Sequence, residues 1–321
     1  GAQSITSFGT LALGNNAAGD YTLTGATGTV TINPLAVILT GSRSYDFSTG
    51  AASSILTVSN AISGDTVAVA SGTGMLAGKN AGAQSITSFG TLALGNNAAG
   101  DYTLTGATGT VTINPETPND IYVGNIYSLL LNRVPDPSAQ GWANALDSGM
   151  APSTVVQDIE QSTEYLNGVV NGLYVHYLKR SADTIGLQGW TNLLAGGGTI
   201  EQVIQGLVSS PEYFALQGNS NSGFVKGLYQ DILGRTAPPS PSDVQGWVNA
   251  LSGATRARVA MGFLTSQEYR INLVDSYYTQ FLHRTDPSGA AGWANALAAG
   301  MTDQAVLARI FGSPEGYALR S

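Results

Sequence analysis

Four kinds of side chain that can do chemistry recur four times in the second part of the sequence. Each set has a tyrosine, an arginine six residues later, a tryptophan directly after a glycine, and a glutamate 21 or 22 residues after the tryptophan. Tryptophan can serve as a stacking platform while arginine and glutamate make polar contacts, so each set could hold a ligand. The four sets are Tyr127, Arg133, Trp142 and Glu164; Tyr174, Arg180, Trp190 and Glu212; Tyr229, Arg235, Trp247 and Glu268; and Tyr278, Arg284, Trp293 and Glu315.

A structural role explains the same repetition more simply. Every copy of a helical repeat needs a large aromatic residue to fill its small core. It also needs an Arg–Glu pair, or an arginine over an aromatic face, to hold helix ends together. We therefore interpret these residues as core anchors of four repeat units. The substitution Trp190→Ala is then expected to cost about 3–5 kcal/mol of stability.

Four aspartates are the candidates for a metal site. Loop carboxylates suit Ca²⁺, but this ion takes roughly six to eight oxygen ligands, and each loop offers one carboxylate. N-capping of a following helix accounts for Asp136 and Asp286, because a proline follows each of them. We expect no cofactor, with calcium as the one alternative left open. The candidates, one in the loop before each tryptophan, are Asp136, Asp183, Asp243 and Asp286.

The sequence contains no recognisable catalytic motif. Its two histidines, His176 and His283, stand at different positions in their repeats, and we expect both on solvated helix positions. There is no Gly-x-Ser-x-Gly elbow, P-loop, His-Glu-x-x-His or EF-hand pattern. The glycines from Gly72 to Gly78 have the wrong spacing for a dinucleotide fingerprint. We therefore expect a protein that is not an enzyme.

Three helices per unit are predicted to position these residues. A long helix with an apolar stripe, such as Leu166 to Leu178, ends at the arginine. The tryptophan lies in a short second helix, and Thr199 opens a third helix with a capping box. Ser210 then caps the next long helix, so helix follows helix through an all-α domain. The domain covers residues 116–321, with units at about 119–161, 162–209, 210–265 and 266–321.

These motifs in combination resemble the helical repeat called domain of unknown function 4214. They are Leu-Tyr before Gly-Arg, then Gly-Trp, then Ser-Pro-Glu-Tyr, and the resemblance covers about residues 121–321. The first unit departs from the pattern, with Asn132 before Arg133 and no proline before Glu164. The resemblance implies a place in secreted bacterial proteins such as adhesins. It implies no activity.

The first part of the chain contains a different repeat. Residues 1–34 recur without change as residues 82–115, an offset of 81 positions. A complete β repeat would then cover residues 35–115, and residues 1–34 would be the C-terminal part of a truncated β repeat. Alternating apolar residues predict six to eight short strands, in a small sandwich or β-grasp-like sheet. The fold class is therefore multidomain, an all-β repeat followed by an all-α helical repeat array.

Four short motifs of this region resemble the YDG-type repeat of filamentous haemagglutinin-like bacterial adhesins. Phe47 departs from the family, which usually has glycine at this position. The resemblance implies an extended, surface-displayed stalk, often in many tandem copies. The motifs are Ser44-Tyr45-Asp46-Phe47, Gly64-Asp65-Thr66-Val67, Lys79-Asn80-Ala81-Gly82 and Ala99-Gly100-Asp101-Tyr102-Thr103-Leu104.

Charge and composition exclude several classes of partner. Residues 1–115 hold four acidic and two basic residues, and residues 116–321 hold seventeen and eleven, so the net charges are −2 and −6. Neither part offers the basic surface that nucleic acid requires. No apolar stretch approaches the roughly 20 residues that would span a bilayer. The absence of cysteine excludes a disulfide framework and thiolate metal sites.

These observations favour a secreted or cell-surface bacterial protein, with an adhesin-type stalk and a helical interaction module. Its partner would be a protein or glycan surface. One alternative is a self-assembly or surface-anchoring module that self-associates, and another is a carbohydrate-binding accessory region with exposed tryptophans. We expect the binding surface where the units differ: the loop 237–243, the linker 218–223 and the exposed helix faces.

Overall fold

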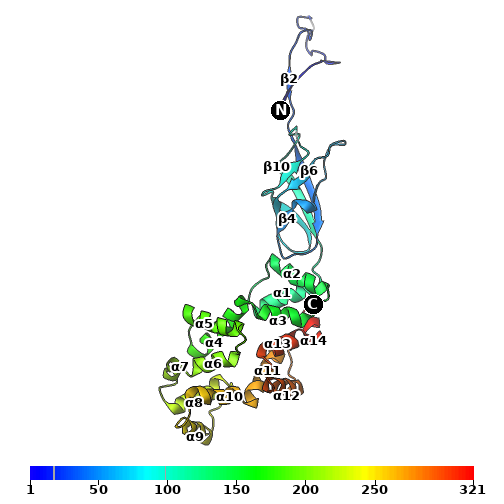
Figure 1. Ribbon diagram of the computed structural model, residues 1–321. Helices are drawn as coiled ribbons and strands as arrows, with labels where there is room; N and C mark the ends of the chain where they lie inside the picture. The colour runs from blue at the N-terminus through cyan, green and yellow to red at the C-terminus, as the bar shows by residue number, and fades with distance from the viewer. Residues whose placement is uncertain (17–18, 98) are drawn as a thin grey trace. The chain divides into compact units, whose positions relative to one another are not determined.

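The computed structural model describes residues 1–16, 19–97 and 99–321. These residues form two compact units, Gly1–Glu116 and Thr117–Ser321. The first unit contains strands and the second contains helices (Figure 1). The predicted fold class, a β part followed by an all-α part, is confirmed. Among the helices described, none is both long enough and apolar enough to cross a bilayer.

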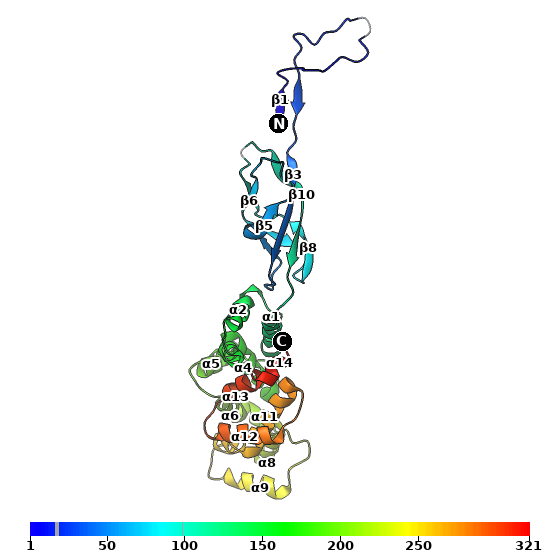
Figure 2. The same cartoon turned by 90° about the vertical axis from the view of Figure 1, so that its right-hand side faces the viewer.

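One six-stranded sheet, ordered β4-β7-β8-β10-β3-β5, is the centre of the β unit. Its two longest strands, β3 (Leu35–Arg43) and β10 (Tyr102–Ile113), run parallel and side by side (Figure 2). On its other side β10 pairs with the antiparallel strand β8 (Gly82–Ser88). The remaining strands of the sheet are β4 (Gly50–Ala52), β5 (Leu56–Val58) and β7 (Thr73–Leu76). A separate pair consists of β6 (Ala68–Ser71) and β9 (Ala93–Gly95).

The sheet buries one face of its central strands. Val37 and Leu39 of β3 and Val111 and Ile113 of β10 alternate with exposed residues and are almost completely buried. Period-two alternation of apolar residues is typical of such half-buried strands. It did not predict that β3 and β10 are parallel, because a half-buried strand has the same pattern in either direction.

Phe47 adopts a left-handed backbone conformation that glycine favours. Its φ of 59° lies in the left-handed region, which costs a residue with a Cβ roughly 1–2 kcal/mol. The Phe47 ring is buried and meets the Tyr45 ring edge-on, with 4.9 Å between their centroids. Burial of this ring offsets the backbone strain, so the turn forms without glycine.

The helical unit repeats a pattern of three helices four times. The first copy has α1 (Pro118–Leu130), α2 (Gln140–Asp147) preceded by the 3₁₀ helix η2 (Pro137–Ala139), and α3 (Pro152–Glu160). The second has α4 (Thr163–Leu178), α5 (Thr184–Ala195) and α6 (Ile200–Val208). The third has α7 (Pro211–Leu216), α8 (Asn221–Asp231), α9 (Pro241–Ala250) and α10 (Arg256–Leu264). The fourth has α11 (Gln267–Leu282), α12 (Pro287–Ala298) and α13 (Asp303–Phe311), with α14 (Pro314–Ala318) after it.

Local capping signals set the ends of these helices. Thr199 and Gln202 form the predicted capping box of α6, and Ser210 caps α7 through the backbone N–H of Tyr213. In the third copy the long helix is divided into α7 and α8. Gly218 and Asn219 between them have φ values of 76° and 51°, which interrupt the helix.

The first and last copies of the helical pattern pack against each other. The Tyr122 ring of α1 lies 4.8 Å from the Tyr317 ring and 5.8 Å from the Phe311 ring, centroid to centroid. The Tyr317 hydroxyl donates a hydrogen bond of 2.6 Å to Oδ1 of Asn119. In both views α14 lies close to α1 (Figures 1 and 2), and α13 packs against α3. The repeats therefore close on themselves, and α3 comes to lie beside α13.

Candidate functional site

In every unit the arginine stacks on the tyrosine six residues before it. The guanidinium carbon lies 4.8 to 5.1 Å from the ring centroid in all four copies. The residue before each arginine adopts a left-handed conformation, which turns the chain back over the helix end. These cap residues are Asn132, Lys179, Gly234 and His283, with φ between 51° and 66°.

Each arginine also binds a glutamate in the first turn of a later helix. Arg133 donates two hydrogen bonds to Glu164, of 2.5 and 3.0 Å, and Arg180 donates two to Glu212, of 2.6 and 2.9 Å. The pairs Arg235–Glu268 and Arg284–Glu315 repeat this forked geometry. Each cluster therefore links the end of one helix to the start of another.

Three of the four candidate calcium ligands are helix caps. Asp136 accepts from the N–H of Ser138, Asp183 from that of Gly186 and Asp286 from that of Gly289. Each also pairs with the arginine of its own unit. Asp243 lies in the first turn of α9, which Ser240 caps. The described residues include no group of three or more acidic, histidine or cysteine side chains arranged to hold a metal ion.

The four tryptophans are partly buried. A Cβ added at Gly206 of α6 would come within 2.3 Å of the Trp190 ring, and one at Gly262 of α10 within 2.8 Å of the Trp247 ring. Trp247 also packs on Phe263, with 5.0 Å between ring centroids. In these two units the ring therefore lies directly on the third helix, at a position where glycine leaves room.

Both histidines lie on the surface, as expected. His176 is exposed on α4, and its Nε2 lies 3.0 Å from the carbonyl oxygen of Asp231. His283 is the exposed left-handed residue that ends α11. The position of His283 is therefore a helix cap rather than a position within the helix.

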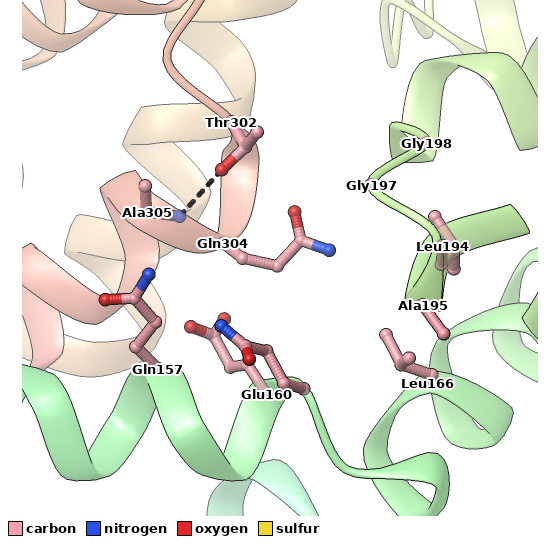
Figure 3. Close-up of a pocket in the computed structure, with 11 residues that line it drawn as sticks. Gln157, Glu160, Leu166, Leu194, Ala195, Gly197, Gly198, Thr302, Gln304 and Ala305 are labelled. Atoms are coloured by element: carbon pink, nitrogen blue, oxygen red, sulfur yellow. Dashed lines mark hydrogen bonds between the residues drawn. The ribbon is translucent and has the colours of Figure 1, made fainter.

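A pocket of about 370 Å³ opens between α3, α13 and the turn from α5 to α6. Gln157 and Glu160 extend into it from α3, and Gln304 extends toward them from α13 (Figure 3). Leu166 and Leu194 line the remaining side, next to the Gly197–Gly198 turn. The linker 218–223 and the loop 237–243, where we expected the binding surface, do not line this pocket.

Glu160 is the chemically unusual residue of this pocket. It is 1% exposed, and its Oε1 accepts a 3.4 Å hydrogen bond from the Tyr165 hydroxyl. Its Oε2 has no hydrogen-bond partner in the part of the chain that the structure describes. Burial raises the pKa of Glu160 to about 9, and the nearby Asp303 adds to the rise. At pH 7 this side chain is therefore a neutral carboxylic acid.

Asp303 continues this buried acidic cluster behind the pocket. It is 4% exposed, and its Oδ2 is likewise without a partner among the described residues. Burial, followed by the neighbouring Glu201, holds the pKa of Asp303 well above its usual range. Asp303 lines a second cavity of about 610 Å³ together with Tyr177, Tyr269 and Tyr277. Burial therefore disfavours the charged form of two carboxyl groups in the helical unit.

The third helices of the four units differ in the chemistry of their last residue. Helices α3, α6, α10 and α13 each have nine residues. They end in Glu160, Val208, Leu264 and Phe311, and all four residues are buried. A carboxyl group thus occupies a position that is apolar in the other three copies. Burying a carboxyl group without a full set of hydrogen-bond partners is costly, so this departure marks a candidate functional site.

Two families of known proteins match parts of the chain. The model of the YDG domain matches residues 29–110. The model described as Domain of unknown function (DUF4214) matches residues 167–217 and 208–273. Both suspected resemblances, and their order along the chain, are thereby confirmed. A search of the curated proteins finds no match.

Proposed function

We propose that this chain, which carries a YDG domain followed by DUF4214 repeats, belongs to a non-catalytic bacterial surface protein of adhesin type. Its helical domain would bind a neutral glycan in the Glu160 pocket. The observation that carries this proposal is the buried, unpartnered carboxyl of Glu160 at a position where the other copies have apolar residues.

The pocket wall has the chemistry of a sugar site. Gln157, Gln161 and Gln304 offer amide donors and acceptors, and the neutral Glu160 offers both a hydroxyl donor and a carbonyl acceptor. Leu166 and Leu194 provide an apolar surface for the C–H face of a sugar ring. The described lining residues include neither lysine nor arginine, so a negatively charged sugar would find no counter-ion there.

The same wall favours binding over hydrolysis. Most glycoside hydrolases place two carboxyl groups on either side of the scissile bond, one as acid and one as base or nucleophile. Glu160 is the single carboxyl residue among the described residues that line this pocket, whereas Asp303 lines the second cavity. We therefore propose that the pocket holds its ligand without cleaving it.

The repeated clusters support a non-catalytic protein as well. Every tyrosine, arginine and glutamate of the four sets is engaged in contacts within the helical domain. The β unit has the YDG sheet and few charged residues, which suits a stalk. A secreted or cell-surface location is proposed on this family context.

A glycan array probed with the full chain at pH 7 tests the proposal. We expect binding to one class of neutral glycan, loss of binding of at least tenfold in Glu160→Val, and retention within about threefold in Glu160→Gln, which stays neutral and hydrogen-bonding. Glu315→Gln, the same change outside the pocket, is the matched control and should bind like the parent chain. Binding to no neutral glycan, or binding that Glu160→Val leaves unchanged, would contradict the proposal.

A further inference from the structure

The second cavity of the helical domain, of about 610 Å³, lies where the second, third and fourth copies of the helical pattern meet. Its lining comes from α4, α6 and α11, from the C-terminal end of α8 and from the start of α13. Small-molecule sites typically have volumes of about 300–1,000 Å³. The described residues that line this cavity do not line the Glu160 pocket. Its apolar walls are Leu173, Ile200, Ile204, Ile232 and Leu233.

Two tyrosines of this cavity occupy positions that are apolar in the other copies. Tyr277 directly precedes the repeated tyrosine of its unit, and Tyr177 lies three residues after that of its own unit. The other units have Ile126, Leu173 and Leu228 at the first position, and Leu130, Ile232 and Phe281 at the second. Packing of the repeat therefore requires no hydroxyl group at either position.

The tyrosine hydroxyl groups of this cavity have unused hydrogen-bonding capacity. Within the described part of the chain, the structure gives no hydrogen bond to the hydroxyls of Tyr177, Tyr269 and Tyr277. Tyr269 has a counterpart in every unit, and those counterparts do have partners. The hydroxyls of Tyr165, Tyr213 and Tyr317 donate to Glu160, Asp231 and Asn119, at 3.4, 2.7 and 2.6 Å. Buried polar groups usually have a partner, so the three free hydroxyls indicate a ligand site.

A buried carboxyl group completes the polar part of the cavity. Asp303 is 4% exposed, and its Oδ2 has no partner among the described residues. Asp303 does not cap α13, because the Thr302 side chain accepts from the N–H of Ala305 and performs that role. The neighbouring Glu201 adds negative charge rather than compensating for it. The fold therefore holds the Asp303 carboxyl in the cavity without giving it a counter-ion.

The charges around the cavity favour a cation. Asp231 lines it as well, so two carboxyl groups face this space. The described lining residues include neither lysine nor arginine, and the lining histidine, His176, is exposed. A negatively charged ligand would therefore meet carboxyl groups without a balancing cation, whereas a positively charged ligand would supply the counter-ion that Asp303 lacks.

A primary ammonium group fits these features best. Its N–H groups can donate both to Oδ2 of Asp303 and to tyrosine hydroxyl oxygens, and hydrogen bonds between charged groups are the stronger ones. The rings of Tyr177, Tyr269 and Tyr277 add to the attraction, because aromatic faces attract cations. The apolar walls suit a hydrocarbon or aromatic body attached to the ammonium group.

We propose that this cavity binds a small apolar amine, with its ammonium group at Asp303 and its body against the apolar walls. The amine site is separate from the Glu160 pocket and does not depend on glycan binding there. Each of the two proposals can therefore fail without the other.

Isothermal titration calorimetry of the full chain at pH 7 tests the proposal. The probe is benzylammonium, and benzyl alcohol, which has a similar shape without the charge, is the control ligand. We expect benzylammonium to bind at one site and benzyl alcohol to bind at least tenfold more weakly, because only the cation pairs with Asp303. Absence of benzylammonium binding, or equally tight binding of the alcohol, would overturn the proposal.

Matched variants locate the ammonium group. Asp303→Asn keeps the size of the side chain but removes its charge, and should weaken benzylammonium binding at least tenfold. Asp158→Asn is the same change at an exposed position of α3 and should leave binding within about threefold of the parent chain. Tyr277→Phe, at a position that is apolar in the other units, should weaken binding severalfold through loss of one hydroxyl. Binding that Asp303→Asn and Tyr277→Phe both leave unchanged would overturn the proposal.

One further variant separates the two cavities. Glu160→Val should bind benzylammonium within about threefold of the parent chain, because Glu160 lines the other pocket. Loss of benzylammonium binding in Glu160→Val, with binding retained in Asp303→Asn, would place the amine in the Glu160 pocket and overturn the proposal.

Discussion

The four Tyr–Arg–Glu clusters and the Glu160 pocket are two regions of the helical domain that use charge in opposite ways. In the clusters, arginine and glutamate are partly exposed and fully paired, so they join helix ends at little cost. Glu160 in the pocket and Asp303 behind it are buried, and each has an oxygen without a partner among the described residues. The comparison separates side chains that the fold needs in every copy from side chains that it would be more stable without.

Loss of a repeated aromatic anchor should have the largest effect. Trp190→Ala would empty the space against Gly206 and is expected to lower the free energy of unfolding by about 3–5 kcal/mol. Urea unfolding followed by far-ultraviolet circular dichroism measures it. Ile185→Ala is the matched control in the same helix, because Ile185 is 85% exposed and its loss should change stability by less than about 0.5 kcal/mol. Equal, small effects of both variants would show that Trp190 is not an anchor.

The pH dependence of stability should show the next largest effect. In the unfolded chain Glu160 has the ordinary pKa of 4.5, and in the folded chain a pKa of about 9, so between these values only the folded state holds the proton. The free energy of unfolding should therefore fall by about 1.4 kcal/mol per pH unit from this residue, or about 2–3 kcal/mol between pH 5 and pH 7. Asp303 adds to the fall in the same direction.

Urea unfolding at pH 5, 6 and 7 measures this slope. Tryptophan fluorescence is the appropriate signal, because all four tryptophans lie in the helical domain. Glu160→Gln should remove the Glu160 share of the slope and leave the share of Asp303. If the slope is the same with and without Glu160, this residue does not hold its proton in the folded state.

Breaking one repeated ion pair should have the smallest effect. Glu268→Gln removes the carboxylate that Arg235 binds at 2.7 and 2.8 Å, but both side chains are more than a third exposed. We expect a loss of less than about 1 kcal/mol, which shrinks as salt is added. Thermal unfolding at low and high salt provides the measurement. A loss of several kcal/mol that is independent of salt would place the pair among the essential core contacts.

Local signals were sufficient to predict much of the helical domain. Thr199 and Ser210 cap the helices that they were predicted to cap, because an N-cap depends on a few neighbouring residues. The apolar stripes predicted the helices of each unit, because a stripe depends only on residues within one helix. Asp183 is an N-cap that went unrecognised, since no proline follows it to signal the start of α5.

Long-range features could not be predicted in this way. The contact of Tyr122 with Phe311 and Tyr317 joins residues almost two hundred positions apart, and no local pattern encodes it. The pocket depends on that contact, because it brings Gln304 opposite Glu160. Glu160 itself was visible in the sequence as an acidic residue aligned with Val208, Leu264 and Phe311. Glu160 is missed when only the residues shared by all four units are considered.

Residues 1–34 and 82–115, which are identical in sequence, show the same limit of prediction from local sequence. Asn16 and Asn97 make the same turn, because the turn is encoded within a few residues. Tyr21 and Tyr102 differ completely in burial, because burial depends on residues 35–81. The local sequence determines the turn in both copies, whereas the complete sheet also requires residues 35–81.

The free energy of unfolding of Glu160→Val at pH 7 tests the central claim most directly. Valine is the residue that ends α6, where it is completely buried, so it suits this position in the repeat. If Glu160 is kept for binding rather than for folding, the variant should be more stable than the parent chain by about 2–3 kcal/mol, and its stability should depend less on pH. A variant that is less stable than the parent chain would contradict the account, because Glu160 would then be a structural residue like the anchors of the four clusters.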